Sequence, residues 1–135
     1  MSADWSQLLA STEYLGELYD GAPPPTDECD LFYVHIDERE DSVTLGFDTR
    51  AFPMNPPPEW RGQDFNAFEF HLFFTGVTGL RVTGWGASEA KAINLTLRDG
   101  GHVEVALGSE ASGITFRAAA ARLTRTRAYL ASNNP

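Results

Sequence analysis

Apolar and polar residues alternate along most of this chain, and that two-residue period restricts its fold more than any other feature. The alternation is clearest over residues 43–47, 68–74, 93–97 and 103–107. Such a pattern places one face of a β-strand in a core and the other toward solvent. It predicts a domain built mainly from antiparallel strands.

The turns between these runs predict two hairpins. Asp99-Gly100-Gly101 separates the last two runs, and this is the strongest hairpin signal in the chain. Residues 31–37 form another strand candidate, which should pair with residues 43–47 through the acidic turn 38–42. Segment 114–130 mixes helix-favouring alanines with β-branched residues, and its interleaved arginines and threonines favour a long, bent edge strand.

Helical periodicity is confined to the N-terminal region. Apolar residues recur every three or four positions over residues 4–19, and Pro23, Pro24 and Pro25 prevent continuation. The predicted fold class is therefore α+β and mainly antiparallel β. One N-terminal helix should pack on a β-sandwich, or on a strongly curved sheet, of six or more strands. The 135 residues fit a single domain, 1–135.

A proline-rich loop should interrupt the strands over residues 50–64, which contain Pro53, Pro56, Pro57 and Pro58. Proline lacks a backbone N–H donor and restricts the residue before it, so this stretch cannot continue a central strand. Loops of this length are often functional. The alternative is a packed loop that pins its aromatic residues, Trp60 among them, onto the core.

Charge is distributed unevenly. The net charge is −9, and residues 1–60 hold 13 acidic and 2 basic residues against 6 and 8 in residues 61–135. Nucleic-acid binders need a basic surface, so DNA and RNA are poor partners. A basic protein would be attracted at long range. Neither a secretory signal nor a membrane-spanning run is visible, so we expect no membrane association and a cytoplasmic location.

No catalytic residues, metal ligands or cofactors are predicted. The Gly-x-Ser-x-Gly motif of serine hydrolases is absent, and Cys29 lies among acids that would raise its pKa. A single cysteine also excludes an internal disulfide. His35, His71 and His102 are widely spaced and follow no metal-binding motif.

Several segments together resemble the immunity protein 50 family of bacterial polymorphic toxin systems. They are Leu18-Tyr19-Asp20-Gly21 followed by prolines, Phe52-Pro53 with Pro56-Pro57-Pro58-Glu59-Trp60, and Asn66 through the aromatic strand to Gly84-Trp85. The order of these segments covers most of residues 5–107, and the arginine-rich C-terminal segment does not contribute to it. The resemblance implies a non-enzymatic immunity protein that binds and neutralises a cognate toxin.

The predicted toxin-binding face combines acidic side chains with an aromatic anchor from the 50–64 loop. Its residues are Asp27, Glu28, Asp30, Glu38, Glu40, Asp41 and Trp60. The partner would be basic, because the acids would speed its capture. Two alternatives remain from the residues alone. One is a small-ligand-binding β domain with Phe68, Phe70, Phe74 and Trp85 lining a pocket, and the other is a small hydrolase that uses His71 or His102.

Overall fold

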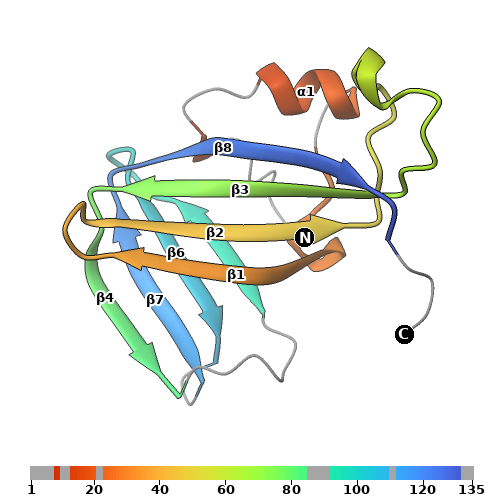
Figure 1. Ribbon diagram of the computed structural model, residues 1–135. Helices are drawn as coiled ribbons and strands as arrows, with labels where there is room; N and C mark the ends of the chain where they lie inside the picture. Colours follow the sequence, from red (N-terminus) through yellow and green to blue (C-terminus); the bar gives the residue numbers. More distant parts are fainter. Residues whose placement is uncertain (1–7, 10–12, 21–22, 85–91, 110–111, 132–135) are drawn as a thin grey trace.

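The computed structural model describes residues 8–9, 13–20, 23–84, 92–109 and 112–131, which form two four-stranded antiparallel sheets and a short helix (Figure 1). Sheet A has the strand order β1 (Cys29–Asp37), β2 (Ser42–Thr49), β3 (Ala67–Thr75) and β8 (Ala120–Tyr129). Sheet B has the order β4 (Thr78–Thr83), β7 (Gly113–Ala118), β6 (Val103–Gly108) and β5 (Ile93–Leu97). The helical segments are α1 (Glu13–Tyr19), η2 (Thr26–Glu28) and η3 (Pro58–Trp60). This arrangement confirms the predicted fold class.

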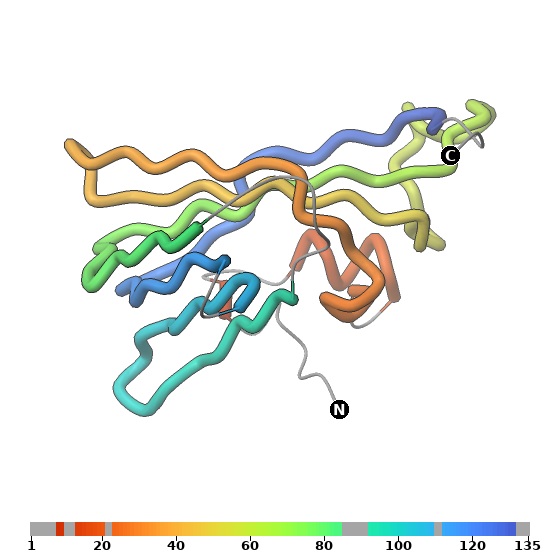
Figure 2. Tube along the Cα trace, turned by 90° about the horizontal axis from the view of Figure 1, so that it is seen from below, coloured from red at the N-terminus to blue at the C-terminus, as the bar shows by residue number. Residues whose placement is uncertain are grey.

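The two sheets and the helix form layers, with sheet A on one side (Figure 2). Sheet B covers part of the inner face of sheet A, and α1 lies beside sheet B on the same side. The chain passes from one sheet to the other twice at one corner, after β3 and at Ala119 between β7 and β8. There the N–H of Ala119 donates to the carbonyl of Thr75 at 2.8 Å. Gly76 has a φ of +63° and a Cβ on it would lie 2.7 Å from that of Ala119, so this corner requires glycine.

The core is made by the alternating residues of the central strands. On β2 and β3 the inward side chains are Val43, Leu45, Phe47, Phe68, Phe70, Leu72 and Phe74, all at most 2 % exposed. Phe74 contacts Phe116 of sheet B at a centroid distance of 5.4 Å, and Phe68 contacts Tyr19 of α1 at 5.9 Å. Each fully buried phenylalanine contributes about 1.5–3 kcal/mol of transfer free energy. Sheet A is therefore held to both other layers by its phenylalanines.

The N-terminal helix is shorter than predicted. It begins at Glu13, because Leu9 makes a parallel bridge to Ala121 beside β8 and Leu8 is also buried in the core. This pairing with the edge of sheet A overrides the helical spacing of the two leucines. Residues 4–7 of the predicted helix lie outside the described part of the chain, as does Trp85. No helix among the described residues is long and apolar enough to cross a membrane.

Segment 114–130 was predicted to form one bent edge strand, but the structure divides it into two strands, one in each sheet. β7 lies inside sheet B, between β4 and β6, whereas β8 is an edge strand of sheet A. At ten residues β8 is also one residue longer than β3, its partner in sheet A. The bend is at Ala119, where the chain leaves one sheet for the other.

Candidate functional site

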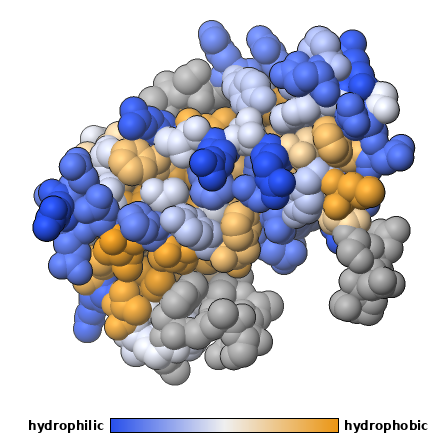
Figure 3. Space-filling model, in the orientation of Figure 1, coloured by the Kyte–Doolittle hydropathy of each residue, from blue (hydrophilic) through white to orange (hydrophobic). Residues whose placement is uncertain are grey.

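The outward face of sheet A is formed by the residues that alternate with the core. On β3 these are Glu69, His71 and Phe73, which point away from sheet B and α1. Figure 3 shows this side of the molecule as a largely hydrophilic surface with apolar side chains among the polar ones. The face therefore offers both charged and apolar contacts.

One row of cross-strand partners runs across all four strands of this face. Tyr33 of β1 lies opposite Gly46 of β2, Gly46 opposite His71 of β3, and His71 opposite Arg125 of β8. We call these four residues the Gly46 row. The first and last of them are 92 positions apart in sequence, so only the strand pairing brings them together.

A β-bulge interrupts each edge strand beside this row. On β1 the register passes from Leu31 to Tyr33 and leaves Phe32 as the extra residue. On β8 it passes from Arg125 to Leu123, which leaves Thr124 as the extra residue. A bulge redirects side chains and is frequent beside functional sites. Here the first bulge brings Phe32 and Tyr33 to the same face of the sheet.

Phe32 and Tyr33 both pack closely against Gly46 and line a hollow beside it. A Cβ on Gly46 would lie 2.9 Å from the Cβ of Tyr33 and 3.0 Å from both Phe32 Cζ and His71 Nε2. The rings of Phe32 and Tyr33 meet the imidazole of His71 edge-on, at centroid distances of 5.8 and 5.6 Å. The hollow has a volume of about 510 Å³, and we call it the Gly46 hollow. Its lining is Phe32, Tyr33, Thr44, Glu69, His71, Thr124 and Arg125.

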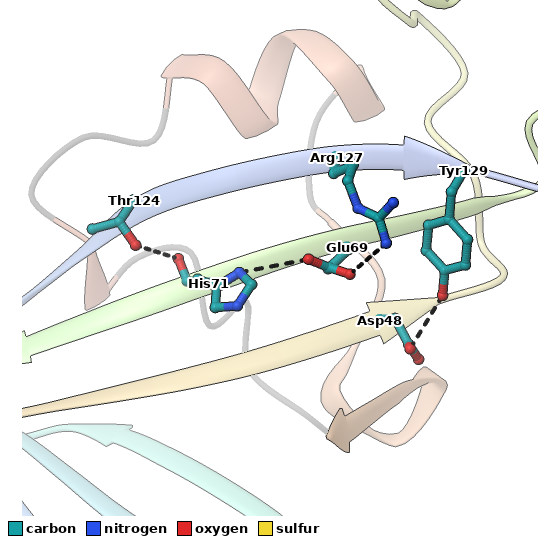
Figure 4. A network of polar contacts seen from close by, with 6 residues as sticks. All are labelled: Asp48, Glu69, His71, Thr124, Arg127 and Tyr129. Atoms are coloured by element: carbon teal, nitrogen blue, oxygen red, sulfur yellow. Dashed lines mark hydrogen bonds and ion pairs between the residues drawn. The ribbon is translucent and has the colours of Figure 1, made fainter. Parts of the chain in front are cut away.

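Polar contacts connect the hollow with the rest of the face (Figure 4). Glu69 accepts a hydrogen bond from Arg127 at 3.1 Å, and its other carboxylate oxygen lies 4.0 Å from His71 Nδ1. The hydroxyl of Tyr129 donates to Asp48 at 3.2 Å. Burial raises the pKa of the Asp48 carboxyl, and this hydrogen bond partly opposes the rise.

His71 is a buried imidazole without a hydrogen-bond partner at Nδ1 among the described residues. Burial lowers its pKa, which Glu69 opposes and Arg125 reinforces. No hydroxyl or thiol in the described part of the chain hydrogen-bonds to this ring, whereas a nucleophile activated by histidine needs such a contact. His102 immediately precedes β6 of the other sheet, and its Nε2 lies 3.8 Å from a carboxylate oxygen of Glu104. Neither histidine of the hydrolase alternative therefore hydrogen-bonds to a nucleophilic side chain among the described residues.

The pocket proposed for the ligand-binding alternative is not formed by its phenylalanines. Phe68, Phe70 and Phe74 are at most 2 % exposed and belong to the main core, while Trp85 lies outside the described residues. Among the described residues no group of three or more histidine, cysteine, aspartate or glutamate side chains is arranged to hold a metal ion.

The structure places the predicted acidic residues in two groups at opposite ends of β1. Asp27, Glu28 and Asp30 lie at its start, and Glu38, Glu40 and Asp41 lie in the turn after it; all six are exposed. A nine-residue strand separates the groups by about 27–30 Å. The 50–64 loop lies at the first end, where Thr49 Oγ1 donates to the carbonyl of Glu28 at 2.8 Å.

Trp60 is half-buried and packs on the core. Its ring lies 5.9 Å from that of Phe68 and 6.4 Å from that of Phe52. The loop thus has the packed arrangement that the sequence left as its alternative. The prominent exposed aromatic residues of sheet A are instead Phe32 and Tyr33, at 49 % and 42 % exposure, which lie on β1 between the two acidic groups.

Sequence reasoning missed this aromatic pair, although a signal was present. The inward residues of β1 are Leu31, Val34 and Ile36, so the alternation contains one three-residue step. Such a step inside a strand indicates an extra residue, and the two positions within it are Phe32 and Tyr33. Gly46 stands between Leu45 and Phe47 in an otherwise regular strand, which is a sign of close approach by another group.

Comparison with known proteins identifies one family. The family model of immunity protein 50 matches residues 11–129, a range that includes both sheets and the Gly46 row. Neither the curated proteins nor the solved structures contain a significant match. The match extends through β8, beyond the segments on which the sequence resemblance rested. The chain belongs to the immunity protein 50 family.

Proposed function

We propose that this protein neutralises a cognate toxin domain by binding it on the outward face of sheet A, without catalysing a reaction itself. Family membership supports the class of function. The observation that carries the binding face is the exposed aromatic pair, Phe32 and Tyr33, held over Gly46 between two acidic groups. Aromatic residues near the centre of an interface often dominate its binding energy.

The acids at the two ends of β1 give this face its electrostatic character. Asp30 of β1 and Asp48 of β2 are also cross-strand partners on it. A basic toxin would be steered toward such a surface, and steering raises association rates by about 10–1000-fold at low salt. Exposed charges change mainly the association rate, whereas a central anchor changes mainly dissociation. In the proposed function the acids therefore speed capture and the aromatic pair prolongs the complex, in the cytoplasm of the producing bacterium.

The test uses the toxin domain encoded beside the gene of this protein. Growth of cells that express the toxin should depend on co-expression of the full chain. The double variant Phe32→Ala/Tyr33→Ala should bind the purified toxin at least about 100-fold more weakly, chiefly through faster dissociation. Its matched control is Val82→Ala/Leu97→Ala, because those side chains are similarly exposed, at 50 % and 49 %, but lie on sheet B.

A second variant separates steering from anchoring. Changing Glu38, Glu40 and Asp41 together to lysine should slow association and reduce its dependence on salt, with little change in stability. If Phe32→Ala/Tyr33→Ala on sheet A and Val82→Ala/Leu97→Ala on sheet B weaken binding equally, the result would argue against the outward face of sheet A as the binding face. Failure of the unmutated chain to bind or protect would refute the proposed function itself.

A further inference from the structure

Three arginines lie on the outward side of β8, and their surroundings differ. The guanidinium of Arg122 lies 5.0 Å from the ring centre of Phe73, and that of Arg127 lies 4.7 Å from the ring centre of Tyr129. Arg127 also pairs with Glu69. Arg125 makes no ion pair and no cation–π contact with any described residue, and it lines the Gly46 hollow. It is thus a cation that lines the hollow without an ion pair to any described residue.

The other charge in the hollow is already balanced. The Glu69 carboxylate lies 3.1 Å from the Arg127 guanidinium and 4.0 Å from the imidazole of His71. A second cation entering the hollow would meet Arg125 and find Glu69 occupied. An anion would meet an uncompensated guanidinium, whose planar N–H groups match a carboxylate in a bidentate pair.

We propose that the Gly46 hollow receives a single aspartate or glutamate side chain of the toxin, with its carboxylate bound by Arg125. This inference rests on the proposed function and names the chemistry of one contact in it. The rings of Phe32 and Tyr33 form apolar walls for the methylene carbons of the incoming side chain. The hydroxyl of Thr44, which makes no hydrogen bond with a described residue, is a further donor in the lining.

The surrounding acids restrict what kind of anion can enter. Asp30 and Asp48 face outward together on the β1–β2 side of the same face, so an extended polyanion would be repelled there. A toxin surface that is basic apart from one carboxylate would pair favourably both with Arg125 and with the two aspartates. Because the face carries one cationic site among acidic residues, it can fix the orientation in which a toxin docks. It also discriminates against basic toxins that lack a carboxylate at the matching position.

The experiment measures binding of the full chain to the toxin domain encoded beside its gene. Arg125→Gln should raise the Kd at least tenfold, which corresponds to about 1.4 kcal/mol. Arg122→Gln is the matched control, because it lies on the same strand and face but stacks on Phe73; it should change the Kd less than about twofold. Thermal unfolding of both variants checks that the fold is retained.

Charge reversal then identifies the partner group. Arg125→Glu should abolish most of the binding, and changing one acidic residue of the toxin to lysine should restore at least tenfold of it. An unchanged Kd for Arg125→Gln, in a chain that binds the toxin, would refute the assignment while leaving the proposed function intact. Tighter binding by Arg125→Glu would show that the hollow receives a basic group and would equally overturn it. Absence of binding by the unmutated chain would refute the proposed function and this inference with it.

Discussion

Replacing Gly46 with alanine tests whether the close packing of Phe32 and Tyr33 requires a residue without a side chain at this position. Gly46 is buried and its φ is not in the left-handed region, so alanine can adopt its backbone conformation. The added methyl would nevertheless lie 2.9 Å from Tyr33 Cβ and 3.0 Å from both Phe32 Cζ and His71 Nε2. Cross-strand Cβ atoms are ordinarily about 4.5–5.5 Å apart. β1 must therefore move away from β2 to accept the change.

Two opposing effects set the magnitude. A glycine-to-alanine change at a compatible backbone position stabilises a protein by about 0.4–1 kcal/mol, because the unfolded chain loses freedom. Overpacking of a close contact destabilises by about 1–3 kcal/mol. We expect the clash to dominate, since the Cβ of Tyr33 cannot rotate away as a ring tip can. The net loss should be about 1–2 kcal/mol of unfolding free energy, or about 3–8 °C in Tm.

Urea unfolding followed by tryptophan fluorescence, with differential scanning calorimetry, measures this change. The same substitution in a Phe32→Ala background separates the contacts, because that background removes the ring but keeps the Tyr33 Cβ. At least half of the destabilisation should remain there. A Gly46→Ala variant as stable as the unmutated chain, or more stable, would show that the close approach is not a constraint and would refute the reasoning.

Three further predictions, the last with its own control, concern titration and the core. Burial lowers the pKa of His71 in the folded chain, so below about pH 6.5 the unfolded chain binds more protons at this residue than the folded chain does. The free energy of unfolding, measured by urea titration, should therefore fall as the pH drops below about 6.5. The fall should be smaller in His71→Gln. Burial raises the pKa of the Cys29 thiol to about 12, so its reaction with a disulfide reagent at pH 8 should be at least about 100-fold slower in the folded than in the denatured protein. Leu45→Ala should cost about 2–5 kcal/mol in urea unfolding because Leu45 is fully buried. Val82→Ala, at an exposed position, should cost under about 0.5 kcal/mol.

The inward face of the sheets was predictable because its pattern is local. In residues 43–47 the apolar side chains of Val43, Leu45 and Phe47 alternate with Thr44 and Gly46. The Asp99-Gly100-Gly101 turn likewise predicts the hairpin of β5 and β6 that the structure contains. A strand with one buried face must show this period in its own sequence. Two hairpins and the core side chains of β2, β3 and β6 follow from it.

The assembly of strands into two sheets was not predictable in the same way. β3 pairs with β8 between residues at least 45 positions apart, and β7 lies between β4 and β6. These pairings depend on which long-range contacts bury the most surface together, and no single segment contains that information. The late start of the helix has the same origin, since Leu9 pairs with Ala121.

The candidate site was harder to predict because it depends on register. The acids that composition made prominent lie at both ends of β1, while the Gly46 row combines residues from four strands. The three-residue step from Leu31 to Val34 indicates a bulge, but it does not say which residues lie opposite it. Only the pairing of Gly46 with Tyr33 and His71 shows why two adjacent aromatic residues share one face.

The bulges alone would not identify this surface, since β4 also has an irregular register between Thr78 and Arg81. What distinguishes sheet A is that its two bulges flank one row. The pairing of β2 with β3 is regular throughout, so the core beneath the row is continuous without them. If β1 lacked the extra residue Phe32, Leu31, Val34 and Ile36 would still face inward in regular alternation. The bulges and the bare Gly46 therefore shape the outward face rather than the core, which is the expected result if selection acts on what that face binds.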